Sequence, residues 1–294
     1  MSVFQAIFLG IVQGLTEFLP VSSSGHLSIF QNLFHIDTGG SVAFDVMLHV
    51  GTLFVVFLVY WKDICKLVIE ACRMIADLFM NLKLALTPRQ DAQPKQYRRI
   101  IRTNYRKFVA LVIVSTIPTG LIGYFGRKLI EDASATMLVP GICLLITGII
   151  LLLSDRVENC WKIPRDVSWG EGILIGIAQG FATLPGISRS GTTIAACTFC
   201  GFERKFAVKY SFILSIPAIL GAAVLELKDL VNESMTPSMA GSYIAGMIAA
   251  AVFGYISIRI VGQMVLRRKM KIFAFYCFGA GALAIIAHIV MLFI

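Results

Sequence analysis

Long apolar runs separated by short polar segments make up most of the chain. Six of the runs approach the roughly 20 residues that an α-helix needs to cross a bilayer. They cover residues 41–61, 108–126, 135–153, 207–226, 243–261 and 272–292. Two further segments, 3–34 and 170–202, are apolar at both ends and interrupted in the middle by Gly, Pro and Ser. The pattern predicts six membrane-spanning helices and two broken helical segments.

The two broken segments contain a sequence repeat. Residues 10–26 (GIVQGLTEFLPVSSSGH) and 176–192 (GIAQGFATLPGISRSGT) align without a gap. Irregular backbone at membrane depth is tolerated only where protein or a wet cavity surrounds it, so each segment is predicted to be a re-entrant helical hairpin with its polar loop at the tip. Three spans separate the hairpins, so the second copy enters from the opposite face. The expected fold is a single all-α integral membrane domain, residues 1–294, built as an inverted-topology repeat of halves 1–153 and 170–294.

Composition and charge agree with a membrane protein. Hydrophobic residues make up 57% of the chain and charged residues 15%, whereas about a quarter of the residues in a soluble domain are charged. The net charge of +9 comes from Lys and Arg between the apolar runs, which indicates membrane topology and anionic lipid headgroups rather than nucleic-acid binding. The positive-inside rule places the basic segments 62–107 and 262–271 on the cytoplasmic face and both termini outside. Residues 62–86 are expected to form an amphipathic helix on the inner membrane surface, followed by a basic connector over 87–107.

The first repeated loop carries the residues of a candidate catalytic site. Glu17 is an ionisable group inside an apolar segment, where an uncompensated charge is costly and usually functional. Gln13 precedes it by four residues and projects from the same helix face, so the two side chains could bind a divalent cation, or Glu17 could act as a base. Ser22, Ser23, Ser24 and His26 follow them in the chain. A Ser–His pair can perform nucleophilic attack with general-base help where the two side chains meet.

The second loop carries an arginine instead. Arg189 stands where the first copy has Ser23, in a Pro, Gly and Ser loop before an apolar helix. A guanidinium, hydroxyls and a helix N-terminus can converge there on a phosphate group. The candidate substrate-binding residues are Arg189, Ser22, Ser24, Ser188, Ser190, Gln179 and Thr193. Elsewhere, Asp45 and His49 could line the cavity or form a hydrogen bond at the edge of a span, and His288 is expected to be structural.

These motifs resemble those of the undecaprenyl-diphosphate phosphatase family, also called the BacA/UppP bacitracin-resistance family. The first family motif, (E/Q)xxxE followed by PxSSxGH, is present between Gln13 and His26. The second, PGxSRSxxT, is present from Pro185 to Thr193. Two long motifs in this order in a six-span chain make the resemblance specific, and it covers essentially the full length. The pattern also allows Glu in place of Gln13, so the Gln weakens any role that needs a charged metal ligand at that position.

The resemblance implies hydrolysis of undecaprenyl diphosphate to undecaprenyl phosphate and inorganic phosphate, with a divalent cation (Mg²⁺ or Ca²⁺) held by Glu17 and Gln13. It also implies recycling of the lipid carrier for peptidoglycan synthesis, bacitracin resistance, and a site facing the outer side of the bacterial cytoplasmic membrane. The expected partners are the polyprenyl diphosphate and the surrounding membrane lipids, without nucleic acid, and a homodimer is an open alternative to a monomer. Ser23 is favoured as the nucleophile, with His26 as base or proton donor and Glu17 orienting or activating them. The competing assignment makes His26 the nucleophile, through a phosphohistidine.

Two other classes of protein share some of these features. Lipid phosphatases of the phosphatidic acid phosphatase class also contain SGH and SR, but they need a further His and Asp shortly after the SR. The residues that follow Arg189, SGTTIAACTFC, contain neither. A transporter or lipid flippase is the second alternative, because inverted repeats are typical of carriers. The chemical asymmetry of the two loops favours an enzyme, and a phosphatase that also flips its product stays open.

Overall fold

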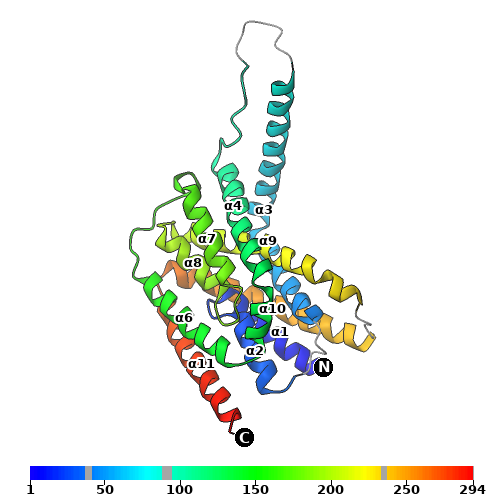
Figure 1. Cartoon of the computed structure of the whole chain (residues 1–294). Coiled ribbons are helices and arrows are strands. Elements are labelled where there is room, and N and C mark those ends of the chain that lie inside the picture. The colour runs from blue at the N-terminus through cyan, green and yellow to red at the C-terminus, as the bar shows by residue number, and fades with distance from the viewer. Residues whose placement is uncertain (37–41, 88–94, 233–236, 294) are drawn as a thin grey trace.

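The computed structural model describes residues 1–36, 42–87, 95–232 and 237–293. The secondary structure in these ranges is helical (Figure 1), apart from one isolated bridge between Lys162 and Phe202. The helices are α1 (Val3–Phe18), α2 (Ser23–Leu33), α3 (Val42–Leu86), α4 (Asn104–Phe125), α5 (Arg127–Ser134), α6 (Leu138–Asp155), the 3₁₀ helix η1 (Pro164–Asp166), α7 (Trp169–Phe181), α8 (Arg189–Phe199), α9 (Arg204–Asn232), α10 (Pro237–Leu266) and α11 (Met270–Met291).

Six helices in the described part of the chain are long and apolar enough to cross a membrane. They are α3, α4, α6, α9, α10 and α11, and each contains one of the six predicted spans or most of it. Many of their large apolar side chains face outward, as Ile113 and Leu283 do, which suits helices whose surrounding solvent is lipid. The prediction of an all-helical, multi-pass membrane protein is confirmed.

Helix α3 is longer than its predicted span. The sequence led us to expect a span over 41–61 and a separate amphipathic helix on the membrane surface over 62–86. Instead, both belong to one helix with a kink at Tyr60 (φ −106°, ψ 18°). No Gly or Pro occurs in residues 52–86, so the backbone offers no helix-ending residue after the span. The last turns of α3 extend beyond the other helices (Figure 1), whereas Glu70 and Asp77 of α3 pair with Arg106 of α4.

The two broken segments form helix pairs, as predicted. Helices α1 and α2 are joined by residues 19–22, and α7 and α8 are joined by residues 182–188. Helix α1 packs against α10 and α7 against α4, while α3 packs against α9 and α6 against α11. Each of these contacts joins the first half of the chain to the second. The two repeated loops therefore come together where the halves meet.

The largest buried apolar cluster surrounds this meeting point. Phe18 and Val21 flank the first loop and pack in one cluster with Leu144 of α6, Ile194 of α8 and Phe212 of α9. Among membrane helices such contacts stabilise mainly through van der Waals packing, since lipid is as apolar as the side chains themselves. Both termini lie at the end of the molecule opposite to the extension of α3 (Figure 1).

Candidate active site

The two repeated loops are bonded to each other. The Ser22 hydroxyl caps α2 by accepting a hydrogen bond from Gly25 N (3.2 Å), and it also accepts one from Gly186 N of the second loop (3.1 Å). A side chain on Gly25 would place its Cβ 2.7 Å from the Gly186 Cα, so the loops approach too closely for one. Ser22 itself has φ 68°, in the left-handed region that residues other than Gly rarely adopt. Such strain persists where the surrounding structure fixes it, which is common at functional loops.

Helix α6 and the first loop fix the second loop in place. The Thr147 hydroxyl donates to the Gly186 carbonyl (2.9 Å) and accepts from Ser188 N (3.1 Å). Ser188 in turn caps α8 through Gly191 N (3.1 Å). The Ser190 hydroxyl donates to the Leu19 carbonyl of the first loop (3.3 Å). The start of α8, and with it Arg189, is therefore held against the first loop.

Glu17 lies at the centre of this junction, buried at the end of α1. Its carboxylate accepts hydrogen bonds from the Ser23 hydroxyl (2.5 Å) and from Gln13 Nε2 (2.9 Å), and it forms an ion pair with Arg189. His49 Nδ1 of α3 lies 3.6 Å from the same carboxylate and 3.0 Å from Gln13 Nε2. A buried carboxylate needs partners of this kind, because burial without them is strongly unfavourable. The structure thus brings the acid and a serine of the first copy onto the arginine of the second.

His26 is engaged elsewhere. Its Nδ1 lies 2.7 Å from the Ser22 carbonyl and its Nε2 lies 2.9 Å from the Tyr276 hydroxyl of α11. Since a carbonyl only accepts, Nδ1 carries the proton, and Nε2 accepts from the tyrosine. The ring also stacks on Tyr276, with centroids 5.6 Å apart. The expected Ser23–His26 pair is therefore not formed in this structure, because the imidazole folds back on the preceding turn and Ser23 bonds to Glu17.

The other candidate binding residues fall into two groups. Ser22 and Ser24 lie with their hydroxyls 3.4 Å apart at the start of α2, and Ser188 and Ser190 lie 3.3 Å apart at the start of α8. These four serines line the two helix N-termini at the junction. The remaining two residues, Gln179 and Thr193, bond to Thr119 of α4 (3.3 Å) and to Ser211 of α9 (2.5 Å), so in this structure their hydrogen bonds fix helix packing.

Two residues of the junction were not assigned a role from the sequence. Tyr276 was not singled out, because a tyrosine in a membrane helix carries no signal of its own. His49 was noted together with Asp45, four residues earlier, and that spacing in an apolar run was the available signal. Asp45 lies one turn before His49 on α3, and its carboxylate accepts a hydrogen bond of 3.4 Å from Gln31 of α2. Together, Asp45 and His49 extend the polar junction along α3.

The expected divalent cation can be tested against the oxygens at the junction. Gln13 Oε1 is buried and lacks a hydrogen-bond partner among the described residues, and it lies on the residue that touches Glu17. No group of three or more His, Cys, Asp or Glu side chains in the described ranges could hold a metal ion. A Mg²⁺ ion commonly takes only one or two protein oxygens and completes its shell with water and substrate phosphates. Glu17 and Gln13 fit a cation bound in that way.

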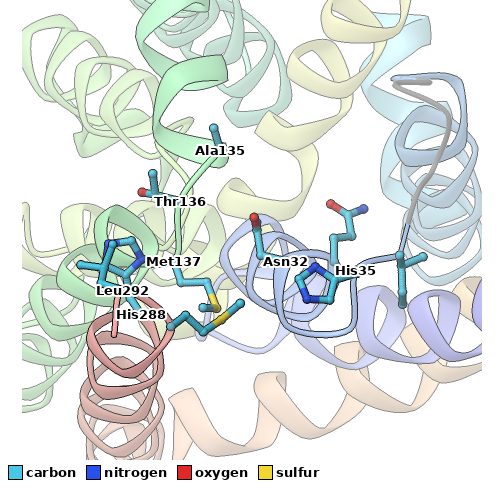
Figure 2. Close-up of a pocket in the computed structure, with 10 residues that line it drawn as sticks. Asn32, His35, Ala135, Thr136, Met137, His288 and Leu292 are labelled. Carbon is cyan, nitrogen blue, oxygen red and sulfur yellow. The ribbon is translucent and has the colours of Figure 1, made fainter. Parts of the chain in front are cut away.

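A separate hollow lies at the far ends of α2 and α11. It has a volume of about 380 Å³ and is lined by residues that include Asn32, His35, Thr136 and His288. Figure 2 shows the two imidazoles on opposite sides of it. His288, expected to be structural, therefore faces a cavity. Gln31 also lines the hollow and bonds to Asp45, so this side of the molecule adjoins the polar residues of α3.

The fold and the Glu17 junction define a class of multi-pass membrane protein. In this class a buried carboxylate binds a serine hydroxyl and an arginine guanidinium at the N-termini of two helices, a set suited to phosphate chemistry. Residues 6–283 match the family described as "Bacitracin resistance protein BacA". The chain belongs to this family. It is similar to the undecaprenyl-diphosphatase of Alkaliphilus metalliredigens, at 40% identity over 97% of this chain and 98% of the relative. It is also similar to that of Methanobrevibacter smithii (40% identity, 100% of both chains) and to undecaprenyl-diphosphatase 4 of Bacillus cereus (36%, 96% of both).

Proposed function

We propose that this protein hydrolyses undecaprenyl diphosphate to undecaprenyl phosphate and inorganic phosphate. The observation that carries the proposal is the Glu17 junction, in which a serine hydroxyl and an arginine, one from each repeat, share one buried carboxylate. The names of the relatives, all diphosphatases over nearly the whole chain, supply the substrate. They also favour hydrolysis over the alternative of a lipid transporter.

Ser23 is our candidate nucleophile, because its hydroxyl already donates to a carboxylate. Its oxygen attacks the terminal phosphorus while Glu17 takes the hydroxyl proton. The bond from that phosphorus to the bridging oxygen breaks, and undecaprenyl phosphate leaves. Water then attacks the phosphoserine, releases inorganic phosphate and restores the serine. His26 is the competing nucleophile, but Tyr276 must first release its Nε2.

Arg189 has two tasks in this scheme. Its guanidinium stabilises the charge that develops on the transferred phosphoryl group, which is the main catalytic contribution in phosphoryl transfer. It also pairs with Glu17 before substrate arrives. Phosphate oxygens that take over the guanidinium leave the Glu17 carboxylate free to accept the Ser23 proton. Substrate binding and activation of the base are thereby linked.

A divalent cation would assist the reaction at the same site. Glu17 and Gln13 would hold a Mg²⁺ or Ca²⁺ ion, which would neutralise charge on the diphosphate. The buried, unpartnered Gln13 Oε1 supports this assignment. Ser22, Ser24, Ser188 and Ser190 remain candidates for contact with phosphate, through their hydroxyls and through the amide groups at the starts of α2 and α8.

We also propose that the two helix pairs are re-entrant hairpins of an inverted-topology repeat. Equivalent glycines of the repeat, Gly10 and Gly176, make equivalent contacts, which supports this view. A Cβ at Gly10 would lie 2.3 Å from the Gly246 carbonyl oxygen of α10, and one at Gly176 would lie 2.2 Å from that of Ser115 in α4. We further propose that the site faces the outer side of the cytoplasmic membrane. On that side the diphosphate released during peptidoglycan synthesis would be recycled, and bacitracin would bind it.

The direct test is phosphate release from undecaprenyl diphosphate by purified protein in detergent with Mg²⁺. We expect Ser23→Ala and Arg189→Ala to lose at least about 10³-fold in rate, as removal of a nucleophile or a transition-state charge does. The matched control is Ser257→Ala, since that serine is buried in α10 and donates only to Phe253 of its own helix. It should retain activity. Wild-type protein that releases no phosphate would refute the proposal and favour the transporter.

Trapping the phosphoenzyme distinguishes the two nucleophiles. Rapid acid quenching with a substrate labelled on its terminal phosphate should give an acid-stable label on wild-type protein, because phosphoserine survives acid and phosphohistidine does not. The label should be absent from Ser23→Ala and present in His26→Gln. A label that is lost in the acid quench, is retained in an alkaline quench and is abolished by His26→Gln would transfer the role to the histidine.

A further inference from the structure

The part of α3 beyond the membrane exposes an apolar surface. Residues 42–61 suffice for a span, and Lys62 and Asp63 mark where charged residues resume. At 1.5 Å per residue, residues 62–86 extend about 37 Å further. In Figure 1 the last turns of this extension lie beyond the other helices, beside the returning segment, residues 95–103, which leads into α4. It therefore projects into water with its apolar side chains.

These side chains recur at alternating intervals of four and three residues. The α3 stripe consists of Cys65, Val68, Cys72, Ile75, Phe79 and Leu82, and Trp61 and Leu86 continue the spacing at its two ends. A repeat of 3.5 residues over more than three heptads is the pattern of the a and d positions of a coiled coil. A helix that packs on a single globular core has a wider stripe with a period of 3.6.

The stripe is exposed in the single chain. Val68 is 56% exposed, Ile75 53%, Phe79 65% and Leu82 52%. An apolar patch of several hundred Å² is rare on surfaces that face water and marks an interaction site. If each stripe residue covers on the order of 100 Å², the stripe offers about 600–800 Å² per partner, close to that of a stable protein interface.

The opposite face of the extension is already occupied, which fixes the direction of the stripe. Glu70 and Asp77 are seven residues apart and share one heptad position. Both pair with Arg106 (2.7 and 2.6 Å), and Asp77 also pairs with Arg102 (2.6 Å). Asn81 exchanges two hydrogen bonds of 2.8 Å with the backbone of Arg98. The returning segment and the first turn of α4, which carries Arg106, are thus bound to one side of α3, and the stripe faces away from both.

We propose that the α3 stripe binds the same stripe of a second copy of this chain, in a parallel two-stranded coiled coil. Two copies in one membrane enter it in the same direction, so helices that continue their spans run parallel and in register. The positions beside the seam include Ile69, Ala71, Ala76 and Leu78, so the pairing sets no like charges against each other there. Lys66 and Arg73 lie away from the seam, where two basic extensions need them to be.

Parallel pairing places identical residues face to face. Cys65 and Cys72 occupy successive a positions, so each lies opposite its own counterpart in the partner. Cα atoms at such positions come within the 4.4–6.8 Å that a disulfide requires, by general coiled-coil and disulfide geometry. Both residues are free cysteines, and Cys72 is exposed. The native Cys65 and Cys72 can therefore report the proposed pairing by forming disulfides between two copies of the chain.

The experiment is disulfide scanning of the full chain in native membranes. In a background that lacks the seven cysteines, single cysteines are restored at 65 and 72 or introduced as Phe79→Cys. The matched controls are Lys66→Cys, Arg73→Cys and Met80→Cys, each one residue further along. Copper phenanthroline should give covalent dimers from the three stripe positions and not from their neighbours. Equal cross-linking of both sets, or none at the stripe, would overturn the proposal, and absence of all dimers would favour an extension that lies on the lipid surface.

A second measurement uses no cysteine. Phe79→Glu and Met80→Glu place the same charge on adjacent exposed residues, which are 65% and 49% exposed. Light scattering in detergent should report a dimer for wild-type protein and Met80→Glu, and a monomer for Phe79→Glu. A monomeric wild type, or equal effects of the two variants, would refute the interface. Neither readout depends on phosphate release, so the interface and the proposed phosphatase activity stand or fall separately.

Discussion

The Glu17 carboxylate is shared by side chains from four helices. Gln13 comes from its own helix α1, Ser23 from α2, His49 from α3 and Arg189 from α8. A carboxylate with this many donors is fixed in place before any substrate arrives. The same arrangement makes Glu17 both a structural and a chemical residue, and these two contributions can be measured separately.

Removing one member of the Glu17–Arg189 pair should destabilise the protein more than removing both. In Glu17→Gln the guanidinium keeps its charge without a counter-ion. We expect a loss of about 2–3 kcal/mol, less than for a fully buried pair because Arg189 is 22% exposed. In the double variant Glu17→Gln with Arg189→Gln, two neutral amides replace the pair and most of the stability should return. Thermal unfolding in one detergent makes the comparison, and a double variant no more stable than Glu17→Gln would contradict it.

The residues of this junction differ in how visible they are in the sequence. Glu17, Ser23 and Arg189 stand out because each is a reactive or charged group in a broken apolar segment. Tyr276 contacts His26 across 250 positions, and tyrosines are common in membrane helices near the interface. The pairing of Ser23 with Glu17, rather than with His26, depends on the turn between α1 and α2. Spacing along the chain cannot specify that turn.

At the scale of elements, the contact between the two loops can be tested through Gly25. In Gly25→Ala the new Cβ would meet the Gly186 backbone at 2.7–2.8 Å, so one loop must shift. Overpacking of this kind typically costs about 1–3 kcal/mol, and the shift should also lower the rate by moving Ser23. The control is Gly120→Ala, where no neighbouring atom lies within 4 Å and a helical alanine is neutral or slightly stabilising. Similar unfolding temperatures for the two variants would show that the loops do not press together.

The elements themselves were largely predictable, with one instructive exception. Six spans and two helix pairs follow from the lengths of the apolar runs and from the Gly, Pro and Ser that interrupt them. The extension of α3 was expected to be a separate surface helix, because charged residues begin at Lys62. The first charged residues after an apolar run show where a helix leaves the membrane, but they do not stop the helix itself. A helix ends at residues such as Gly or Pro, and residues 52–86 have neither.

At the scale of the whole molecule, the orientation in the membrane decides which pool of diphosphate reaches the site. The two termini and the α3 extension lie at opposite ends of the molecule (Figure 1). The returning segment carries Arg98, Arg99 and Arg102, and the positive-inside rule assigns such basic loops to the cytoplasm. The termini should then face outward, on the side where the lipid carrier is released in its diphosphate form.

Labelling of single cysteines tests this orientation. In a cysteine-free background, Ser2→Cys and Arg99→Cys both place a thiol at an exposed position. A membrane-impermeant maleimide should label Ser2→Cys in intact spheroplasts and Arg99→Cys only after lysis, because the basic end stays in the cytoplasm. The reverse pattern would place the extension outside, and an outward-facing site would no longer follow. The coiled coil would remain under that outcome, since parallel pairing of two α3 extensions requires only that both copies enter the membrane in the same direction.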